Sequence, residues 1–155
     1  MKIALGADHG GAAQKTALVA HLKDAGYEVS DYGTMSAEAS VDYPDYALAV
    51  AHAVAAAQAD LGILICGTGI GMAIAANKVS GIRAATVTDV NAAGLARRHN
   101  DANVIALSGR FTSLATNLAI VDAFLDARFE GGRHQKRLDI IAAAETSTKP
   151  SKRQD

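Results

Sequence analysis

The chain has 155 residues, with 15 Lys plus Arg against 16 Asp plus Glu, and this length is typical of one globular domain. Half of the residues are hydrophobic, which excludes a wholly disordered chain, although 34 of them are alanine and none is tryptophan. A net charge of -1 argues against nucleic-acid binding. The short apolar start and the lack of a run of about 20 apolar residues predict a cytoplasmic protein without a membrane partner.

The hydrophobic pattern predicts strands and helices that alternate along the chain. In chain order the expected strands are 2–7, 28–32, 61–66, 84–88 and 104–107, and the expected helices are 12–25, 43–57, 72–78, 91–99, 113–127 and 135–144. The run at 61–66 is almost entirely apolar, as in a central strand that is buried on both faces of a parallel sheet. The alternation predicts a doubly wound α/β fold, with a Rossmann-like five-stranded parallel sheet and helices on both faces.

The chain shows no internal repeat and no linker that would divide it. We therefore expect a single domain over residues 1–145. Residues 146–155 contain Ser, Thr, Lys, Pro and Gln but no aliphatic or aromatic side chain, which predicts a flexible, solvated tail.

Ligands of an open parallel sheet bind beyond the carboxyl ends of its strands, because loops and helix N-termini converge there. This rule draws attention to the residues that directly follow each strand. They are Asp8 and His9, the glycine-rich loop at 67–71, Asp89, and the segment 108–110, which includes Arg110. Together they offer acids, bases and a cation at one edge of the sheet.

The glycine-rich loop could be interpreted as a nucleotide site, but its spacing argues against this. The dinucleotide fingerprint G-x-G-x-x-G requires a glycine at position 72, where this chain has Met72, and no G-x-x-x-x-G-K-[ST] loop occurs. Backbone N–H groups at a helix N-terminus favour negative charge, so the loop suits an enediolate oxygen as well as a phosphate.

Cys66 is the single cysteine and directly precedes this loop. It can form neither an intrachain disulfide nor, by itself, a thiolate metal site, and we predict no metal. A lone cysteine in an apolar run is more often a packing residue. A thiol beside a helix N-terminus can also act as a base or nucleophile, and the adjoining loop favours this second interpretation.

Basic residues toward the C-terminus form the other candidate group. His99 follows two arginines near a helix end, where a capping role is the simpler interpretation. Arg133 and Arg137 are four residues apart and could grip a phosphate dianion from one helix face, but a solvated basic face is equally compatible with the pattern. His21 and His52 lie within predicted helices, and we interpret both as structural.

Six segments of the chain resemble the ribose-5-phosphate isomerase B family, which includes galactose-6-phosphate and allose-6-phosphate isomerases. They are GADHGG at 6–11 with Lys15, DYPDYA at 42–47, GILICGTGIG at 62–71, IAANKVSGIRA at 74–84, RHNDANV at 98–104 and EGGRHQKR at 130–137. The resemblance covers about residues 1 to 145.

The resemblance implies a cofactor-free aldose–ketose isomerase of the pentose phosphate pathway, which interconverts ribose 5-phosphate and ribulose 5-phosphate through a cis-enediol. Cys66 would be the base with Thr68 beside it, and His99 would open the sugar ring with help from Asp8. The implied substrate-binding residues are His9, Tyr43, Gly67, Gly69, Ile70, Gly71, Asn100, Arg110, Arg133, His134 and Arg137. Active sites shared within a homodimer or homotetramer are also implied.

The chain departs from the family pattern at several positions. Some members use a glutamate six residues after the cysteine position as the base, and Met72 stands there, so Cys66 is the only candidate base in this loop. Ala12 stands where a bulky aromatic is usual, which affects local packing more than catalysis. The segment 91–93 replaces a stretch that often carries an aromatic side chain, which could alter the preferred sugar. A hexose 6-phosphate or tetrose 4-phosphate isomerase, or a sugar-phosphate-binding module without turnover, therefore remain as alternatives.

Overall fold

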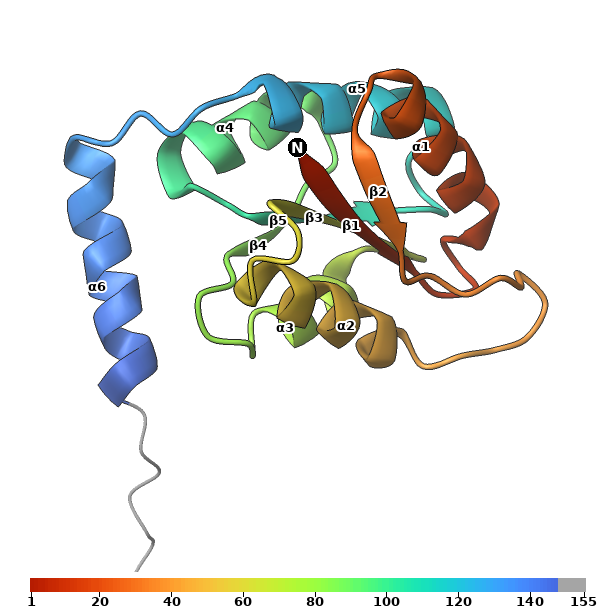
Figure 1. The fold of residues 1–155 in the computed structure, drawn as a ribbon, viewed down its shortest axis with the longest axis horizontal. Coiled ribbons are helices and arrows are strands. Elements are labelled where there is room, and N and C mark those ends of the chain that lie inside the picture. Colours follow the sequence, from red (N-terminus) through yellow and green to blue (C-terminus); the bar gives the residue numbers. More distant parts are fainter. Residues whose placement is uncertain (148–155) are drawn as a thin grey trace, which may run out of the picture.

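The computed structural model describes residues 1–147, and strands and helices alternate along this part of the chain (Figure 1). Its five strands are β1 (Lys2–Ala7), β2 (Glu28–Asp31), β3 (Leu61–Cys66), β4 (Ala84–Thr86) and β5 (Val104–Ser108). Its six helices are α1 (Ala12–Asp24), α2 (Tyr43–Ala55), α3 (Ile70–Ala76), α4 (Val90–Asn100), α5 (Leu114–Asp126) and α6 (Arg133–Ser147). Each element predicted from the sequence is present in the predicted order.

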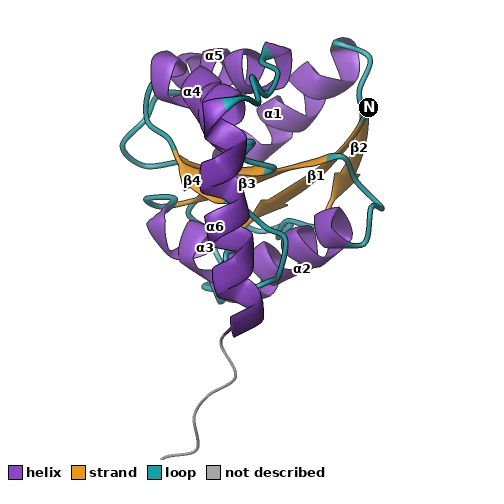
Figure 2. Ribbon diagram, turned by 90° about the vertical axis from the view of Figure 1, so that its left-hand side faces the viewer, coloured by secondary structure: helices purple, strands orange, loops and turns teal. Residues whose placement is uncertain are grey.

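The strands form one parallel sheet in the order β2-β1-β3-β5-β4, with β3 at its centre. Helices α1, α4 and α5 cover one face of the sheet, and α2 and α3 cover the other (Figures 1 and 2). The predicted doubly wound, Rossmann-like α/β fold is confirmed. The chain places β5 inside the sheet and β4 at its edge, an order that the strand pattern alone did not predict.

Two hydrophobic cores lie between the sheet and its helical layers. On the side of α1, α4 and α5, large side chains dominate, and Phe124 is fully buried in the same cluster as Ile63 and Ile65 of β3. On the side of α2 and α3 the core is largely alanine. Strand β3 and helix α2 approach closely there: a Cβ added at Gly62 would lie only 2.8 Å from Val50 Cγ1. Small side chains thus compensate for the scarcity of large ones.

Several element boundaries differ from the predicted ones. Helix α3 begins at Ile70, two residues early, because Gly69 adopts a left-handed conformation (φ 78°) and caps it. Helix α6 begins directly after Gly132 and extends to Ser147, so Thr146 and Ser147 are helical and not part of a tail. The remainder of the predicted tail, 148–155, lies outside the described residues.

The topology opens a crevice at the carboxyl edge of the sheet. The neighbouring strands β1 and β3 lead into α1 and α3, which lie on opposite faces (Figure 1). Loops that diverge in this way leave a gap above the strand ends, where α/β proteins bind ligands.

Helix α6 lies outside both helical layers and runs across the β4 edge of the sheet (Figure 2). Among residues 133–146 of this helix, only His134 and Leu138 are buried, whereas Ile140 and Ile141 are exposed. Within residues 1–147, none of the helices combines the length and apolar character that a membrane crossing requires.

Candidate functional site

The loop after β1 forms one wall of the crevice. The Asp8 carboxylate is buried, and its Oδ1 accepts hydrogen bonds from the N–H groups of Gly10 at 2.8 Å and Gly11 at 3.1 Å. A Cβ at Gly10 would lie 2.8 Å from the nitrogen of Gly67, so the loops after β1 and β3 touch backbone to backbone. Asp8 is therefore fixed beside the glycine-rich loop.

Cys66 is the last residue of β3 and is 5% exposed at the base of this loop. Its Sγ accepts a hydrogen bond from the Gly69 N–H at 3.1 Å. Thr68 is exposed beside it, and its Oγ1 accepts from the Ile70 N–H at 3.3 Å. The chain thus holds the thiol in one orientation at the crevice floor.

Side chains from three other segments surround the loop. The Tyr43 ring lies over Gly71, where an added Cβ would be 2.6 Å from the ring, and the Arg110 side chain lies over Gly67. His9 lies beside Asp8 in the sequence, and its Nδ1 accepts from the Val41 N–H at 3.2 Å. These residues assemble at the carboxyl edge as the sequence predicted.

Two further features of this edge were not assigned from the sequence. Ser108 Oγ donates to the carbonyl oxygen of Gly67 at 2.8 Å, which ties the loop to β5. A hollow of about 520 Å³ adjoins the loop and is lined by Thr68, Ile70, Thr88, Ser108, Phe111, Thr112, Ser113 and Thr116. Asp89, in contrast, caps α4 by accepting from the Ala92 N–H at 2.8 Å, so its role is structural.

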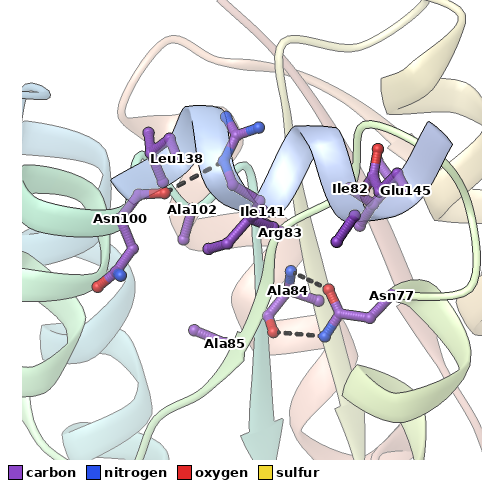
Figure 3. Close-up of a pocket in the computed structure, with 11 residues that line it drawn as sticks. Asn77, Ile82, Arg83, Ala84, Ala85, Asn100, Ala102, Leu138, Ile141 and Glu145 are labelled. Atoms are coloured by element: carbon purple, nitrogen blue, oxygen red, sulfur yellow. Dashed lines mark hydrogen bonds between the residues drawn. The ribbon is translucent and has the colours of Figure 1, made fainter. Parts of the chain in front are cut away.

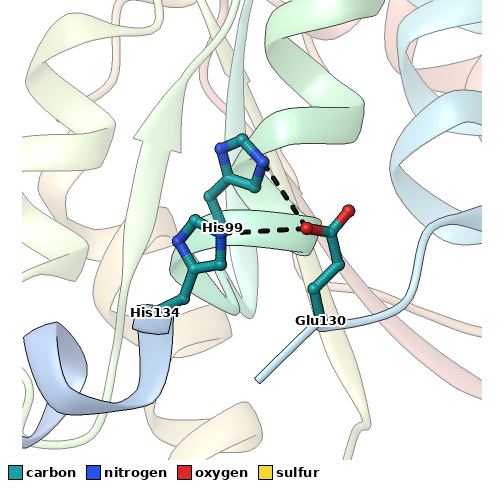
Figure 4. Close-up of side chains that lie close together, drawn as sticks. All are labelled: His99, Glu130 and His134. Atoms are coloured by element: carbon teal, nitrogen blue, oxygen red, sulfur yellow. Dashed lines mark ion pairs between the residues drawn. The ribbon is translucent and has the colours of Figure 1, made fainter. Parts of the chain in front are cut away.

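The second candidate group lies where α4 and α6 meet. The rings of His99 and His134 stack with centroids 4.3 Å apart, and the Nε2 of each lies 3.7 Å from Glu130 Oε2 (Figure 4). The helix cap is Asp101 and not His99. Burial lowers the pKa of His134, the positive charges of His99, Arg133 and Arg137 act in the same direction, and Glu130 opposes them.

The group around Cys66 lies at the carboxyl ends of the strands, and the group around His99 lies at their amino ends, the amino edge of the sheet. Helix α4 ends at Asn100, and the chain then turns to the start of β5, where the Gly62 N–H donates to the Asn103 carbonyl at 2.8 Å. Cys66 ends the same strand that Gly62 helps to begin, about 13 Å further along at about 3.3 Å per residue. One chain therefore does not bring His99 to Cys66. Asn100, Arg133, His134 and Arg137 share the remote position of His99.

Glu130 is the main residue of this cluster that the sequence did not single out as a site. Its spacing of four residues from His134 is a local signal, but α6 begins only at Arg133 and Glu130 precedes it. The contact with His99 depends on the segment before α6, where the Glu130 N–H donates to the Arg98 carbonyl at 3.0 Å. The three side chains are also the one group of at least three His, Cys, Asp or Glu within residues 1–147 whose ligand atoms are close enough for a metal ion.

A second cavity, of about 540 Å³, separates α6 from the β4 edge (Figure 3). Its polar groups largely pair with one another: the Asn77 side chain donates to the Ala84 carbonyl at 2.8 Å and accepts from the Ala84 N–H at 2.7 Å. Leu138 and Ile141 of α6 supply much of its apolar wall. We interpret it as the groove over which α6 lies.

The chain is similar in sequence to known proteins of one family. The ribose/galactose isomerase family matches the chain over residues 3–141. The chain belongs to this family. Ribose-5-phosphate isomerase B of Escherichia coli K12 is 53% identical over 144 residues, which cover 93% of this chain and 96% of that protein.

Solved structures agree over nearly the whole domain. Ribose-5-phosphate isomerase B of Clostridium thermocellum has a TM-score of 0.92 and 52% identity, with 94% of this chain and 98% of that chain covered. The enzyme of Mycoplasma genitalium, solved with bound ribulose-5-phosphate, has a TM-score of 0.91 and 48% identity, with coverage of 95% and 97%. The family resemblance detected in the sequence is confirmed.

Proposed function

We propose that this protein is a cofactor-free isomerase that interconverts ribose 5-phosphate and ribulose 5-phosphate. The observation that carries the proposal is the position of Cys66, a buried thiol held beside a glycine-rich loop at the ligand-binding edge of the sheet. The similarity to a structure that contains ribulose-5-phosphate supports the choice of sugar. With this substrate pair, we assign the protein to the pentose phosphate pathway and propose that it acts in the cytoplasm.

Cys66 is the base of the proposed reaction. Its thiolate takes the proton from C2 of the open-chain aldose, and the electron pair of that C–H bond forms the C1–C2 double bond of an enediolate. The proton of the C2 hydroxyl passes to the oxygen on C1, which becomes the hydroxyl of the ketose, while the oxygen on C2 becomes the new carbonyl. The Cys66 thiol then returns a proton to C1, so the thiolate is regenerated.

Backbone N–H groups of the loop stabilise the negative oxygen of the enediolate. Two of them are already engaged, because Gly69 donates to Cys66 Sγ and Ile70 donates to Thr68 Oγ1. Within residues 1–147, no acceptor engages the N–H groups of Gly67 or Thr68. These two groups are the ones that we assign to the oxyanion, with Tyr43 beside the sugar hydroxyls and His9 beside the phosphate.

The test is turnover in deuterium oxide with a panel of phosphorylated aldoses of four, five and six carbons. We expect the highest kcat/KM for ribose 5-phosphate, and deuterium from the solvent at C1 of the ribulose 5-phosphate that forms. A higher efficiency with the tetrose or hexose phosphate would reassign the substrate. Binding without turnover of any of the sugars would leave a sugar-phosphate-binding module.

A second copy of the chain completes the site in this proposal, within a homodimer or homotetramer. The support is the separation of the two groups: Cys66 and the loop lie at one edge, and His99, Asn100 and the arginines of α6 lie at the other. His99 of one chain would open the sugar ring above Cys66 of its partner, with Asp8 assisting. Arg133, His134 and Arg137 would meet the phosphate together with Arg110.

Mixing two inactive variants tests this arrangement. When Cys66→Ala and His99→Ala proteins exchange subunits, some sites combine both wild-type residues, and in a random mixture roughly a quarter of all sites do so. We expect activity to return toward that fraction, measured after exchange has been verified by mass spectrometry, while each variant refolded alone stays inactive. Verified exchange without recovery would contradict a site shared through His99.

A further inference from the structure

Ser108, the last residue of β5, is buried and holds the glycine-rich loop through its side chain. It is 3% exposed, and its Oγ donates to the Gly67 carbonyl oxygen at 2.8 Å. The same Oγ accepts from the Phe111 N–H at 3.0 Å. A hydroxyl has one proton to donate, and the bond from Phe111 uses a lone pair, so the proton stays committed to Gly67.

The Gly67 carbonyl is held from the side of β5. Besides the Ser108 hydroxyl, the Arg110 N–H donates to it at 3.2 Å. The preceding carbonyl, of Cys66, accepts from the Gly109 N–H at 2.8 Å. All three donors come from the end of β5 and the turn that follows it. The first carbonyl groups of the loop are therefore turned toward β5.

Peptide geometry then fixes the direction of the next N–H group. The carbonyl and the N–H of a trans peptide point in opposite directions, so the Thr68 N–H points away from β5. Strand β1 lies on the other side of β3 from β5, and the loop after β1 carries Asp8 and lies against Gly67. The Thr68 N–H thus faces the crevice between the loops after β1 and β3. No acceptor in the described part of the chain engages it.

We propose that Ser108 is a positioning residue for the oxyanion-stabilising group of the isomerase. Its hydroxyl keeps the Gly67–Thr68 peptide in the orientation that directs the Thr68 N–H at the enediolate oxygen. This role rests on the proposed function, in which that N–H is one of two donors to the oxyanion. Ser108 acts through this peptide and is not itself a catalytic residue.

The glycine at position 67 makes such a restraint necessary. Because Gly67 has no Cβ, its backbone reaches conformations that other residues avoid, and the peptide that follows it can rotate at low cost. A rotated peptide would place the Gly67 carbonyl oxygen where the Thr68 N–H now lies, and its partial negative charge would repel the enediolate. A donor that is already oriented stabilises the developing oxyanion better, because it need not reorganise during the reaction.

Two side-chain amides hold the turn after Ser108. Asn117 of α5 is fully buried, and its Nδ2 donates to the Ser108 carbonyl at 2.9 Å and to Gln14 Oε1 at 2.8 Å. Gln14 of α1 in turn donates to the carbonyl oxygens of Gly109 at 3.1 Å and Thr112 at 2.9 Å. Helices α1 and α5 thus fix the turn, so Ser108 holds the glycine-rich loop from a fixed position.

Kinetics of the Ser108→Ala variant test this role. It should lower kcat for ribose 5-phosphate by about 10-fold, less than the roughly 10²- to 10³-fold loss when an oxyanion donor itself is removed, because the Arg110 N–H still holds Gly67. KM should change little, since the interaction is made in the transition state. Affinity for a phosphorylated four-carbon hydroxamate, a planar mimic of the enediolate, should fall together with kcat. Ser108→Thr keeps the hydroxyl and should retain more of kcat than Ser108→Ala.

Ser113→Ala is the matched control. Ser113 caps α5, where its Oγ accepts from the Thr116 N–H at 3.1 Å. The variant also removes a serine hydroxyl that is bonded to the backbone, so it should lower the melting temperature but leave kcat unchanged. A kcat of Ser108→Ala close to that of the wild-type protein would overturn the role of Ser108. An equal loss of kcat in Ser113→Ala, or a loss confined to KM, would do the same.

A crystal structure of Ser108→Ala gives a readout that does not depend on turnover. We expect the Gly67–Thr68 peptide to be rotated or to occupy two orientations, and a single unchanged orientation would overturn the role. Wild-type protein that turned over no phosphorylated aldose would overturn the proposed function instead. The orientation of the peptide in the variant would still decide whether Ser108 holds it.

Discussion

The two edges of the sheet carry reactive side chains that are held in opposite ways. At the carboxyl edge, Cys66 and Asp8 are buried and receive hydrogen bonds from backbone N–H groups that their own loops supply. At the amino edge, His99 and Glu130 remain partly exposed and lie at ion-pair distances with little hydrogen bonding. The chain's own backbone holds the side chains at the carboxyl edge, whereas those at the amino edge have few hydrogen bonds to the chain.

This difference bears on where a second chain would bind in the proposed oligomer. Backbone donors at a strand end are fixed by the sheet, so they cost no further ordering when a ligand arrives. Side chains on α6 depend on a helix that buries His134 and Leu138 and that is held near its other end by hydrogen bonds from Ser80 and Gly81 to Glu145. Binding of a sugar phosphate or of a second chain would therefore order the amino edge more than the carboxyl edge.

The largest expected effect comes from removing the thiol. Cys66→Ala should lower kcat by about 10² to 10⁴-fold, the range for loss of a general base, with a much smaller change in substrate affinity. Steady-state kinetics and a thermal melt check this result. Turnover close to that of the wild-type protein would remove Cys66 from the reaction and break the contrast between the two edges.

The next effect concerns the arginines of α6. Arg137→Ala should weaken ribose 5-phosphate by about 1.5 to 3 kcal/mol, the contribution of a charge-assisted hydrogen bond, but should hardly change the binding of unphosphorylated ribose. Arg133→Ala should act similarly, and Lys136→Ala on the same helix is the matched control. An equal loss for both sugars would assign the two arginines a structural role instead.

A smaller effect on stability compares tight with open packing. Gly10→Ala places a Cβ 2.8 Å from the Gly67 nitrogen, so we expect the free energy of unfolding to fall by about 1 to 3 kcal/mol. Gly94→Ala in α4 meets no atom within 4 Å and should raise it by about 0.5 to 1 kcal/mol. Chemical denaturation measures both. If both variants changed the free energy of unfolding equally, the contact between the loops after β1 and β3 would be too loose to resist an added Cβ.

The fold class and the part of the candidate site at the carboxyl edge could be predicted from the sequence alone. The apolar run at 61–66 predicts a buried central strand, and its last residue is then bound to lie at the ligand-binding edge, because parallel strands all end there. Cys66, Asp8, Arg110 and the glycine-rich loop follow from local pattern and this one rule. The family resemblance added the class of substrate, a phosphorylated sugar, and the proposal of ribose 5-phosphate.

The start of α3, the strand order and the position of His99 depend on tertiary packing. The early start of α3 depends on the left-handed conformation of Gly69, and the inner position of β5 depends on how α4 crosses the sheet. His99 meets Glu130 and His134 only because the segment leading into α6 lies against the end of α4, a contact between segments far apart in the sequence. Spacing along a chain sets which residues share a helix face, but packing between helices sets which faces meet, and that packing placed His99 away from Cys66.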